Sequence, residues 1–181
     1  MSNKDLRKII LAGISLLLLI IALASCSSDP PASTSLIPAS NSPIPAGKPA
    51  NPIKQVTINV QAADDTVVIP LDNITANRNT RFKLATDEGE MTFMAYIWDG
   101  ELYVRGDICP PCRSRSFTLT KGTLVCDACG TVFDAVNGQG IRGACVAYPK
   151  EPASYELSGN NVVIGKANLV TAYENTLTAN Y

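Results

Sequence analysis

The sequence predicts a small all-β domain, an antiparallel barrel or sandwich that carries two metal-binding loops. Short alternating apolar runs, each a few residues long, are typical of strands with one buried face. Glycine-containing turns separate many of these runs. Two C-x-x-C pairs, Cys109-Pro-Pro-Cys112 and Cys126-Asp-Ala-Cys129, fall between predicted strands. Both pairs are therefore expected at the ends of strands, at one end of the domain.

Five strands are expected in the first half of the domain, at residues 55–60, 66–71, 81–84, 91–98 and 101–104. The run at 91–98 is apolar on both alternating faces, which indicates a central strand covered on two sides. The Asp99-Gly100 pair that follows it predicts a tight hairpin turn, because these residues tolerate positive φ.

The second half repeats this pattern, with strands expected at 116–120, 123–125, 131–136, 155–157 and 161–164. Residues 167–177 place Leu169, Tyr173 and Leu177 at helical spacing, so this stretch is expected to form a short C-terminal helix or an ordered tail.

Four thiolates from Cys109, Cys112, Cys126 and Cys129 suit tetrahedral Zn²⁺, a mononuclear iron or an iron–sulfur cluster. The chain contains no histidine. Imidazole ligands, histidine-based acid–base catalysis and a Ser-His-Asp triad are therefore excluded, and we expect no bond-making chemistry.

Cys145 gives the domain an odd number of cysteines. It is a candidate fifth ligand or a neighbouring sulfur, and the alternative is a small buried apolar residue. Arg113 and Arg115 flank the first pair. They either offset the negative charge of the thiolates or are solvated strand residues.

The N-terminus has the pattern of an export signal. Lys4, Arg7 and Lys8 precede an apolar stretch at residues 9–24. Leu23-Ala24-Ser25-Cys26 resembles the lipobox of bacterial lipoproteins. This resemblance implies a signal peptide over residues 1–25, cleavage before Cys26 and a diacylglycerol on its sulfur. The alternative is an uncleaved N-terminal membrane anchor, and either one places the domain outside the cytoplasm.

Residues 26–54 are rich in proline, serine, alanine and asparagine, and they predict an extended linker. The metal-binding domain is then expected over residues 55–181. The net charge is −1, which argues against a nucleic-acid partner. The expected partner is the membrane itself, through the N-terminal lipid.

The second half of the domain resembles the Rieske pattern, through Cys126-x-x-Cys129-Gly130-x-x-Phe133-Asp134. Cysteines stand where Rieske proteins keep histidines, which rules out a His₂Cys₂ centre.

A broader resemblance is to the FtrD-like family of membrane iron–sulfur proteins. It covers residues 67–71, 92–103, the two C-x-x-C pairs and residues 143–149. It implies a membrane-attached iron–sulfur or iron domain with a redox or iron-transport partner at the membrane.

Three functions are compatible with these patterns. The first is electron transfer or iron handling, associated with iron transport. The second is a binding module stabilised by a Cys₄ zinc site. The third is thiol–disulfide exchange at Cys109-Pro-Pro-Cys112. Tyr96, Trp98 and Tyr103 are expected to pack in the core, with an electron path as the alternative.

Overall fold

The structure is a computed structural model of the chain, and it describes residues 44–180. The described residues form three four-stranded sheets and two helices. All strand pairs are antiparallel except the short pairing of β1 with β4. The predicted antiparallel β class is therefore confirmed. The sheets are layered, and the described residues form no closed barrel.

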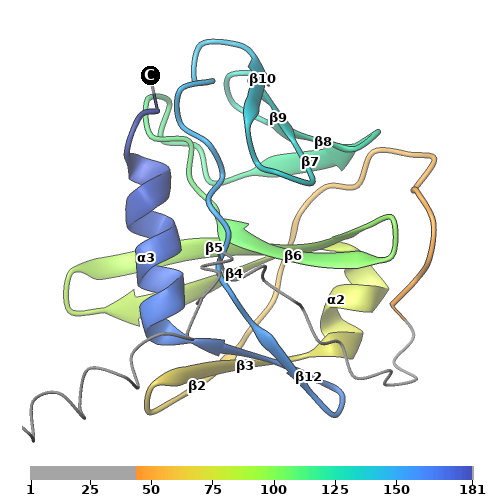
Figure 1. Cartoon of the computed structure of the whole chain (residues 1–181), viewed down its shortest axis with the longest axis vertical. Helices are drawn as coiled ribbons and strands as arrows, with labels where there is room; N and C mark the ends of the chain where they lie inside the picture. Colours follow the sequence, from red (N-terminus) through yellow and green to blue (C-terminus); the bar gives the residue numbers. More distant parts are fainter. Residues whose placement is uncertain (1–43, 181) are drawn as a thin grey trace, which may run out of the picture. The chain divides into compact units, whose positions relative to one another are not determined.

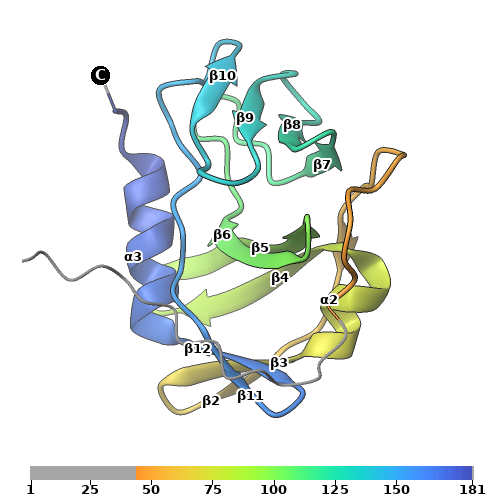
Figure 2. The ribbon, with the colours of Figure 1, turned by 45° about the vertical axis from the view of Figure 1, so that its right-hand side comes forward.

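The middle sheet has the order β1-β4-β5-β6 and contains β1 (Val56–Thr57), β4 (Asn79–Thr86), β5 (Gly89–Trp98) and β6 (Glu101–Gly106). A second sheet contains β7 (Phe117–Thr120), β8 (Thr123–Cys126), β9 (Val132–Asp134) and β10 (Gly140–Arg142). The third contains β2 (Gln61–Ala63), β3 (Thr66–Pro70), β11 (Glu156–Ser158) and β12 (Asn161–Gly165). Figures 1 and 2 show the three sheets as successive layers.

Strand β5 contributes to two cores, one on each face of the middle sheet. Phe93 and Ile97 point into an apolar core shared with the third sheet and the helices. Met94 and Tyr96 point into a second core shared with β7, β8 and β9, which also contains buried cysteines. The prediction of a central strand covered on both faces is confirmed.

Helix α3 (Lys166–Leu177) confirms the predicted C-terminal helix, and it packs along β5, β6 and β12. Helix α2 (Leu71–Asn77) was not predicted. It is a two-turn helix that buries Leu71 and Ile74. It ends at Asn77 and is capped by Arg78, whose left-handed backbone lets its N–H donate to the Ile74 carbonyl.

The predicted strand over 55–60 is wrong in extent. Only Val56–Thr57 pairs with β4, and Gln61–Ala63 pairs with β3 in a different sheet. The chain crosses from one layer to another between these two pairings, so one continuous strand cannot form.

Residues 44–54 lie against the domain. The Arg78 side chain donates to the carbonyls of Pro45 and Gly47, and Ile53 forms a β-bridge with Leu119. The predicted signal peptide at 1–25, Cys26 and the predicted linker up to residue 43 lie outside the described residues. Neither helix of residues 44–180 has the length and apolarity that crossing a bilayer requires.

Candidate metal centre

The two C-x-x-C pairs form loops with the same backbone geometry, which we call the first loop (residues 109–114) and the second loop (residues 126–131). In each loop the N–H of the first cysteine donates to a carbonyl five residues later. Cys109 bonds to Ser114 at 2.8 Å, and Cys126 bonds to Thr131 at 2.9 Å. These bonds close both loops and turn the side chains of each pair toward one side.

The residue after the second cysteine is left-handed in both loops. It is Gly130 in the second loop, with φ +69°, and Arg113 in the first, with φ +58°. This conformation is readily available to glycine and costs a residue with a Cβ about 1 kcal/mol or more. The first loop therefore adopts the same geometry at a cost in backbone conformational energy at Arg113.

The cysteine sulfurs of the two loops lie close to one another. Cys112 Sγ lies 3.7 Å from Cys126 Sγ, and Cys109 Sγ lies 3.9 Å from Cys129 Sγ. Four thiolates at metal–sulfur distances of about 2.3 Å lie about 3.8 Å apart in a tetrahedron. The spacing across the two loops therefore matches sulfurs that can share a ligand sphere.

Cys145 joins this group from the segment after β10. Its Sγ lies 3.8 Å from Cys129 Sγ, and the sulfurs of Cys109, Cys112, Cys129 and Cys145 all lie within 4.8 Å of one another. Cys126 stands outside that set of four but touches Cys112. We call all five residues the five-cysteine group.

Thr131 fixes Cys145 against the second loop. The Cys145 N–H donates to Thr131 Oγ1 at 3.2 Å. Gly143, at φ +119°, makes this approach possible, because a Cβ there would lie 2.6 Å from Thr131 Oγ1. The Cys129 thiol donates to the same oxygen at 3.2 Å, and when Cys129 is ionised the Thr131 hydroxyl can donate to the thiolate instead.

The two ends of the group differ in exposure and in thiol acidity. Cys109, Cys126 and Cys145 are buried, Cys112 is half-buried and Cys129 is exposed. Burial raises the pKa of the Cys109 thiol, and contacts with Cys145 and Cys112 raise it further. At Cys129 burial also acts to raise the pKa, but the hydroxyl and N–H of Thr131 outweigh it and lower the pKa to about 6.

This order of acidity argues against thiol exchange at the first loop. A thiol–disulfide oxidoreductase needs a low pKa at the first cysteine of its C-x-x-C pair, usually at a helix N-terminus. Here the first cysteine is buried with a raised pKa, and the loop connects β6 to β7.

Lys150 is a site residue that sequence reasoning missed. Its side chain is fully buried, and Nζ donates to the carbonyls of Ile108 at 2.7 Å and Tyr148 at 3.0 Å. Nζ also lies 4.4 Å from the centre of the Phe133 ring. Burial lowers the pKa of this amine to about 8, and nearby thiols, Cys109 first, act to raise it. The only signal in the sequence is a lysine directly after the mostly apolar run 144–149.

Asp107 was also missed. It lies two residues before Cys109, is fully buried, and neither carboxylate oxygen has a hydrogen-bond partner among the described residues. Arg81 Nε is 4.0 Å from the carboxylate. Burial raises the pKa of Asp107 to about 7.

The predicted arginines have different surroundings. Arg113 is exposed on the first loop, while Arg115 is half-buried with its guanidinium 3.8 Å from Glu90. The aromatic residues pack in or beside the second core. Tyr96 is fully buried, donates to the Ala135 carbonyl at 2.6 Å, and stacks on Tyr103 with ring centres 5.3 Å apart.

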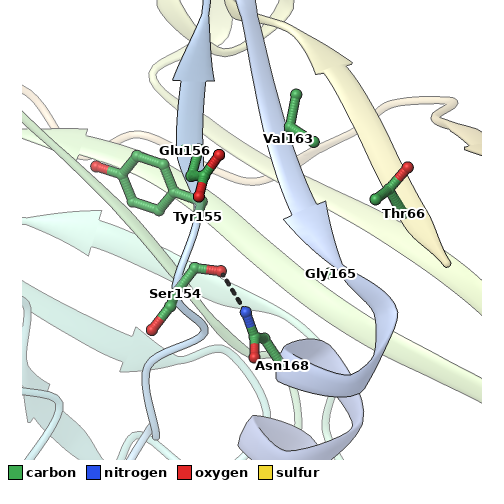
Figure 3. A pocket seen from close by; sticks show the side chains of 7 residues that line it. All are labelled: Thr66, Ser154, Tyr155, Glu156, Val163, Gly165 and Asn168. Atoms are coloured by element: carbon green, nitrogen blue, oxygen red, sulfur yellow. Dashed lines mark hydrogen bonds between the residues drawn. The ribbon is translucent and has the colours of Figure 1, made fainter.

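A shallow hollow of about 350 Å³ lies elsewhere, on the third sheet beside the start of α3. Figure 3 shows its lining, in which the Asn168 amide donates to the Ser154 carbonyl at 3.4 Å. No cysteine lines this hollow, so it is separate from the five-cysteine group.

Fold and site together define a β-sandwich domain with a thiolate metal-binding centre. The model of the family "Membrane iron-sulfur containing protein FtrD-like" matches residues 74–175, more than half of the chain. The chain belongs to this FtrD-like family. The matched segment contains all five cysteines of the group.

Two further comparisons were made. The search of curated proteins gave no match. Among solved structures, one similar chain comes from the complex of reduced oxygenase and oxidized ferredoxin in carbazole 1,9a-dioxygenase. The identity is 17%, the TM-score is 0.41, and the alignment covers 48% of this chain and 81% of that chain.

The residues present fit the cofactor that the family implies. Iron–sulfur clusters are held by cysteine thiolates, commonly four, and five thiols gather here with three sulfur pairs at 3.7–3.9 Å. The chain therefore has the donors for an iron–sulfur cluster or iron. The same donors also suit Zn²⁺.

Proposed function

We propose that this protein is a membrane-attached electron-transfer module outside the cytoplasm, acting in iron handling. The observation that carries the proposal is the five-cysteine group, buried at Cys109, Cys126 and Cys145 and exposed at Cys129. A redox centre needs shielding from water on most sides and a short path to a partner on one side. Cys129 gives such a path to the surface.

The cofactor would supply the one-electron chemistry, and the chain supplies its surroundings. Cys109, Cys112, Cys126 and Cys129 are the proposed ligands of an iron–sulfur cluster. Cys145, whose Sγ lies 3.8 Å from that of Cys129, is a fifth candidate and takes the place of Cys126 in the set that suits a single ion. Thr131 orients Cys129 and Cys145. The buried Phe117 and Phe133 rings meet edge to face, 6.1 Å apart, in the core that surrounds the buried cysteines, where they exclude water.

The membrane location rests on two supports. The family is described as a membrane family, and the sequence resembles a lipobox at Cys26. We propose that the lipid on Cys26 and the linker after it tether the domain beside a membrane redox or iron-transport partner. Replacing Cys26 with serine should move the protein from the membrane fraction to the soluble fraction, and unchanged membrane retention would refute lipid anchoring.

The redox proposal is tested on the full chain, extracted from membranes and purified without oxygen. We expect bound iron, visible sulfur-to-iron charge-transfer absorption, and bleaching by dithionite that reverses on reoxidation. The double variant Cys109→Ser and Cys129→Ser, purified in the same way, should be colourless. An iron-free wild type, or a colour that does not respond to reduction, would refute electron transfer.

A zinc-stabilised binding module is the second candidate, because four of the sulfurs lie close enough to surround a single tetrahedral ion. In that case the purified chain would be colourless and contain one zinc per chain. Chelation would then lower its melting temperature without removing any redox signal.

A further inference from the structure

Lys150 is a buried cation without a carboxylate partner. It is fully buried, and within residues 44–180 it forms no ion pair with an aspartate or glutamate. An ammonium group removed from water is costly unless a nearby negative charge compensates it. Two carbonyl oxygens and an aromatic face solvate its Nζ, but they carry no net charge. The fold therefore retains a buried positive charge that needs an explanation.

The ionisable groups near Lys150 belong mainly to the five-cysteine group, whose thiols become negative when they bind a metal as thiolates. Its electrostatic neighbours are the thiols of Cys109, Cys126 and Cys145, together with the buried carboxyl of Asp107. The ammonium is also joined to the first loop, because the carbonyl that it bonds at 2.7 Å belongs to Ile108, directly before Cys109. Lys150 therefore lies on the buried side of the group, because the Phe117 and Phe133 rings beside its Nζ belong to the core that contains Cys109, Cys126 and Cys145.

We propose that Lys150 is a positioning residue that holds a fixed positive charge against the thiolate centre, strengthening metal binding and raising the centre's reduction potential. This inference rests on the proposed function for the potential, whereas the effect on metal affinity requires only that the group binds a metal. Four thiolates around a divalent ion leave a net charge of about −2, and reduction adds another negative charge to a redox centre. A buried cation favours each of these more negative states, and the low interior dielectric makes its effect larger than that of an exposed charge.

The exposed arginine of the first loop provides a contrast. Arg113 follows Cys112 directly, but its side chain is exposed, so water and salt screen its charge. Lys150 is five residues from its nearest cysteine in the sequence, Cys145, and is shielded from solvent. Burial, rather than closeness in sequence, makes Lys150 the effective compensating charge.

The experiment compares Lys150→Met, Lys150→Gln and Lys150→Arg in the full chain, with Lys83→Gln as a control that removes an exposed positive charge from β4. Co²⁺ affinity is measured by competition with a chelator on reduced protein. We expect Lys150→Met and Lys150→Gln to weaken Co²⁺ binding at least tenfold. Lys150→Arg should bind Co²⁺ within about threefold of wild type, and Lys83→Gln should leave the affinity unchanged. Equal affinity in all variants would overturn the inference.

Stability measurements separate charge compensation from a structural role. Urea unfolding is measured for each variant with and without Co²⁺. Lys150→Met removes an uncompensated buried charge, so its metal-free form should be as stable as wild type or more stable, while the metal-loaded form loses stability. An equal loss in both forms would show that Lys150 acts only in folding and would overturn the proposal.

The iron form provides the third readout. Loss of the charge should lower the midpoint potential by about 59 mV for each tenfold change in a one-electron equilibrium. A wild type that binds Co²⁺ but shows no redox activity would refute the proposed function and leave the affinity result standing. Variants that match a redox-active wild type would refute only the Lys150 inference.

Discussion

The two cysteine loops share a backbone geometry but differ in almost everything around it. The first loop carries the buried Cys109 and closes with a left-handed arginine, and it lies beside a buried lysine and a buried aspartate. The second loop carries the exposed Cys129 and closes with a left-handed glycine. Each loop buries its first cysteine, but only the second brings a cysteine, Cys129, to the surface. The comparison teaches that loops of similar geometry can play different parts in one centre.

Removing one cysteine from each loop should give the largest effects. Cys109→Ser and Cys129→Ser should each abolish metal binding, because the loops contribute to one common site. They should differ in the stability of the metal-free protein. The buried Cys109→Ser change should cost about 1–2 kcal/mol and the exposed Cys129→Ser change less than about 0.5 kcal/mol. Metal analysis and urea unfolding test this, and equal costs would contradict the placement of Cys109 on the buried side of the centre and of Cys129 at its surface.

Two sets of four sulfurs could hold a single ion. Both contain Cys109, Cys112 and Cys129, and the fourth sulfur comes from either Cys126 or Cys145. For a single Co²⁺ ion, Cys145→Ser should weaken binding more than Cys126→Ser, because the sulfur of Cys145 lies in the mutually close set. Chelator competition measures both affinities. The reverse order would restore the set Cys109, Cys112, Cys126 and Cys129 as the ligands of a single ion.

The residue two positions before each loop gives a further contrast. It is buried Asp107 for the first loop and buried Leu124 for the second. Burial raises the pKa of Asp107 in the folded protein to about 7, from an ordinary value of 3.8 for an aspartate carboxyl. The folded protein therefore holds this proton more tightly, so its contribution to stability is greatest below about pH 4 and is lost as the pH rises toward 7.

Asp107→Asn should remove this pH dependence. Between pH 5 and pH 8, wild type should lose about 3 kcal/mol of unfolding free energy relative to the variant. Urea unfolding of both proteins in the same metal state measures this difference. If the unfolding free energies of both proteins changed in parallel with pH, the Asp107 carboxyl would not be the origin of the pH dependence.

The left-handed positions should respond in opposite directions. Gly130→Ala places a Cβ at φ +69° without any steric contact within 4 Å, so it should cost about 1 kcal/mol from backbone strain alone. Arg113→Gly relieves the same strain and should stabilise the protein by a few tenths of a kcal/mol after the entropy cost of glycine. Thermal unfolding of both variants tests whether the loops are conformational equivalents.

Thr131 should have the smallest effect, on thiol reactivity. Thr131→Val removes the hydroxyl donor and should raise the Cys129 pKa from about 6. Alkylation of Cys129 at pH 6 in reduced, metal-free protein should then slow several-fold, while Thr131→Ser keeps the wild-type rate. Ser114 occupies the same position in the first loop, and Ser114→Ala should change Cys129 labelling less than twofold. Equal effects of Thr131→Val and Ser114→Ala would refute the role given to Thr131.

Local patterns predicted much of this fold. Alternation over 91–98 identified β5 and its two buried faces, and the spacing of the C-x-x-C pairs located two loops that the structure brings together. Helix α2 was missed because its seven residues are too few to show helical periodicity. The strand at 55–60 failed because alternation does not show where a chain changes sheets.

The site could be predicted where residue types alone indicate its chemistry. It could not be predicted where the burial and contacts of a residue determine its role. Cysteine spacing identified the sulfurs of the two pairs, but Lys150 lies outside both pairs and, as a lysine, is expected at the surface. Thr131 follows directly after the Cys-Gly pair, and only its contacts with Cys129 and Cys145 show what it does. Long-range packing, which one sequence does not display, determines both roles.

X-ray absorption at the iron edge of anaerobically purified full chain tests most directly whether both loops bind one centre. The account predicts four sulfur neighbours per iron at about 2.3 Å, without nitrogen or oxygen neighbours. A shell of mostly oxygen or nitrogen neighbours, or one with two or fewer sulfurs per iron, would contradict it.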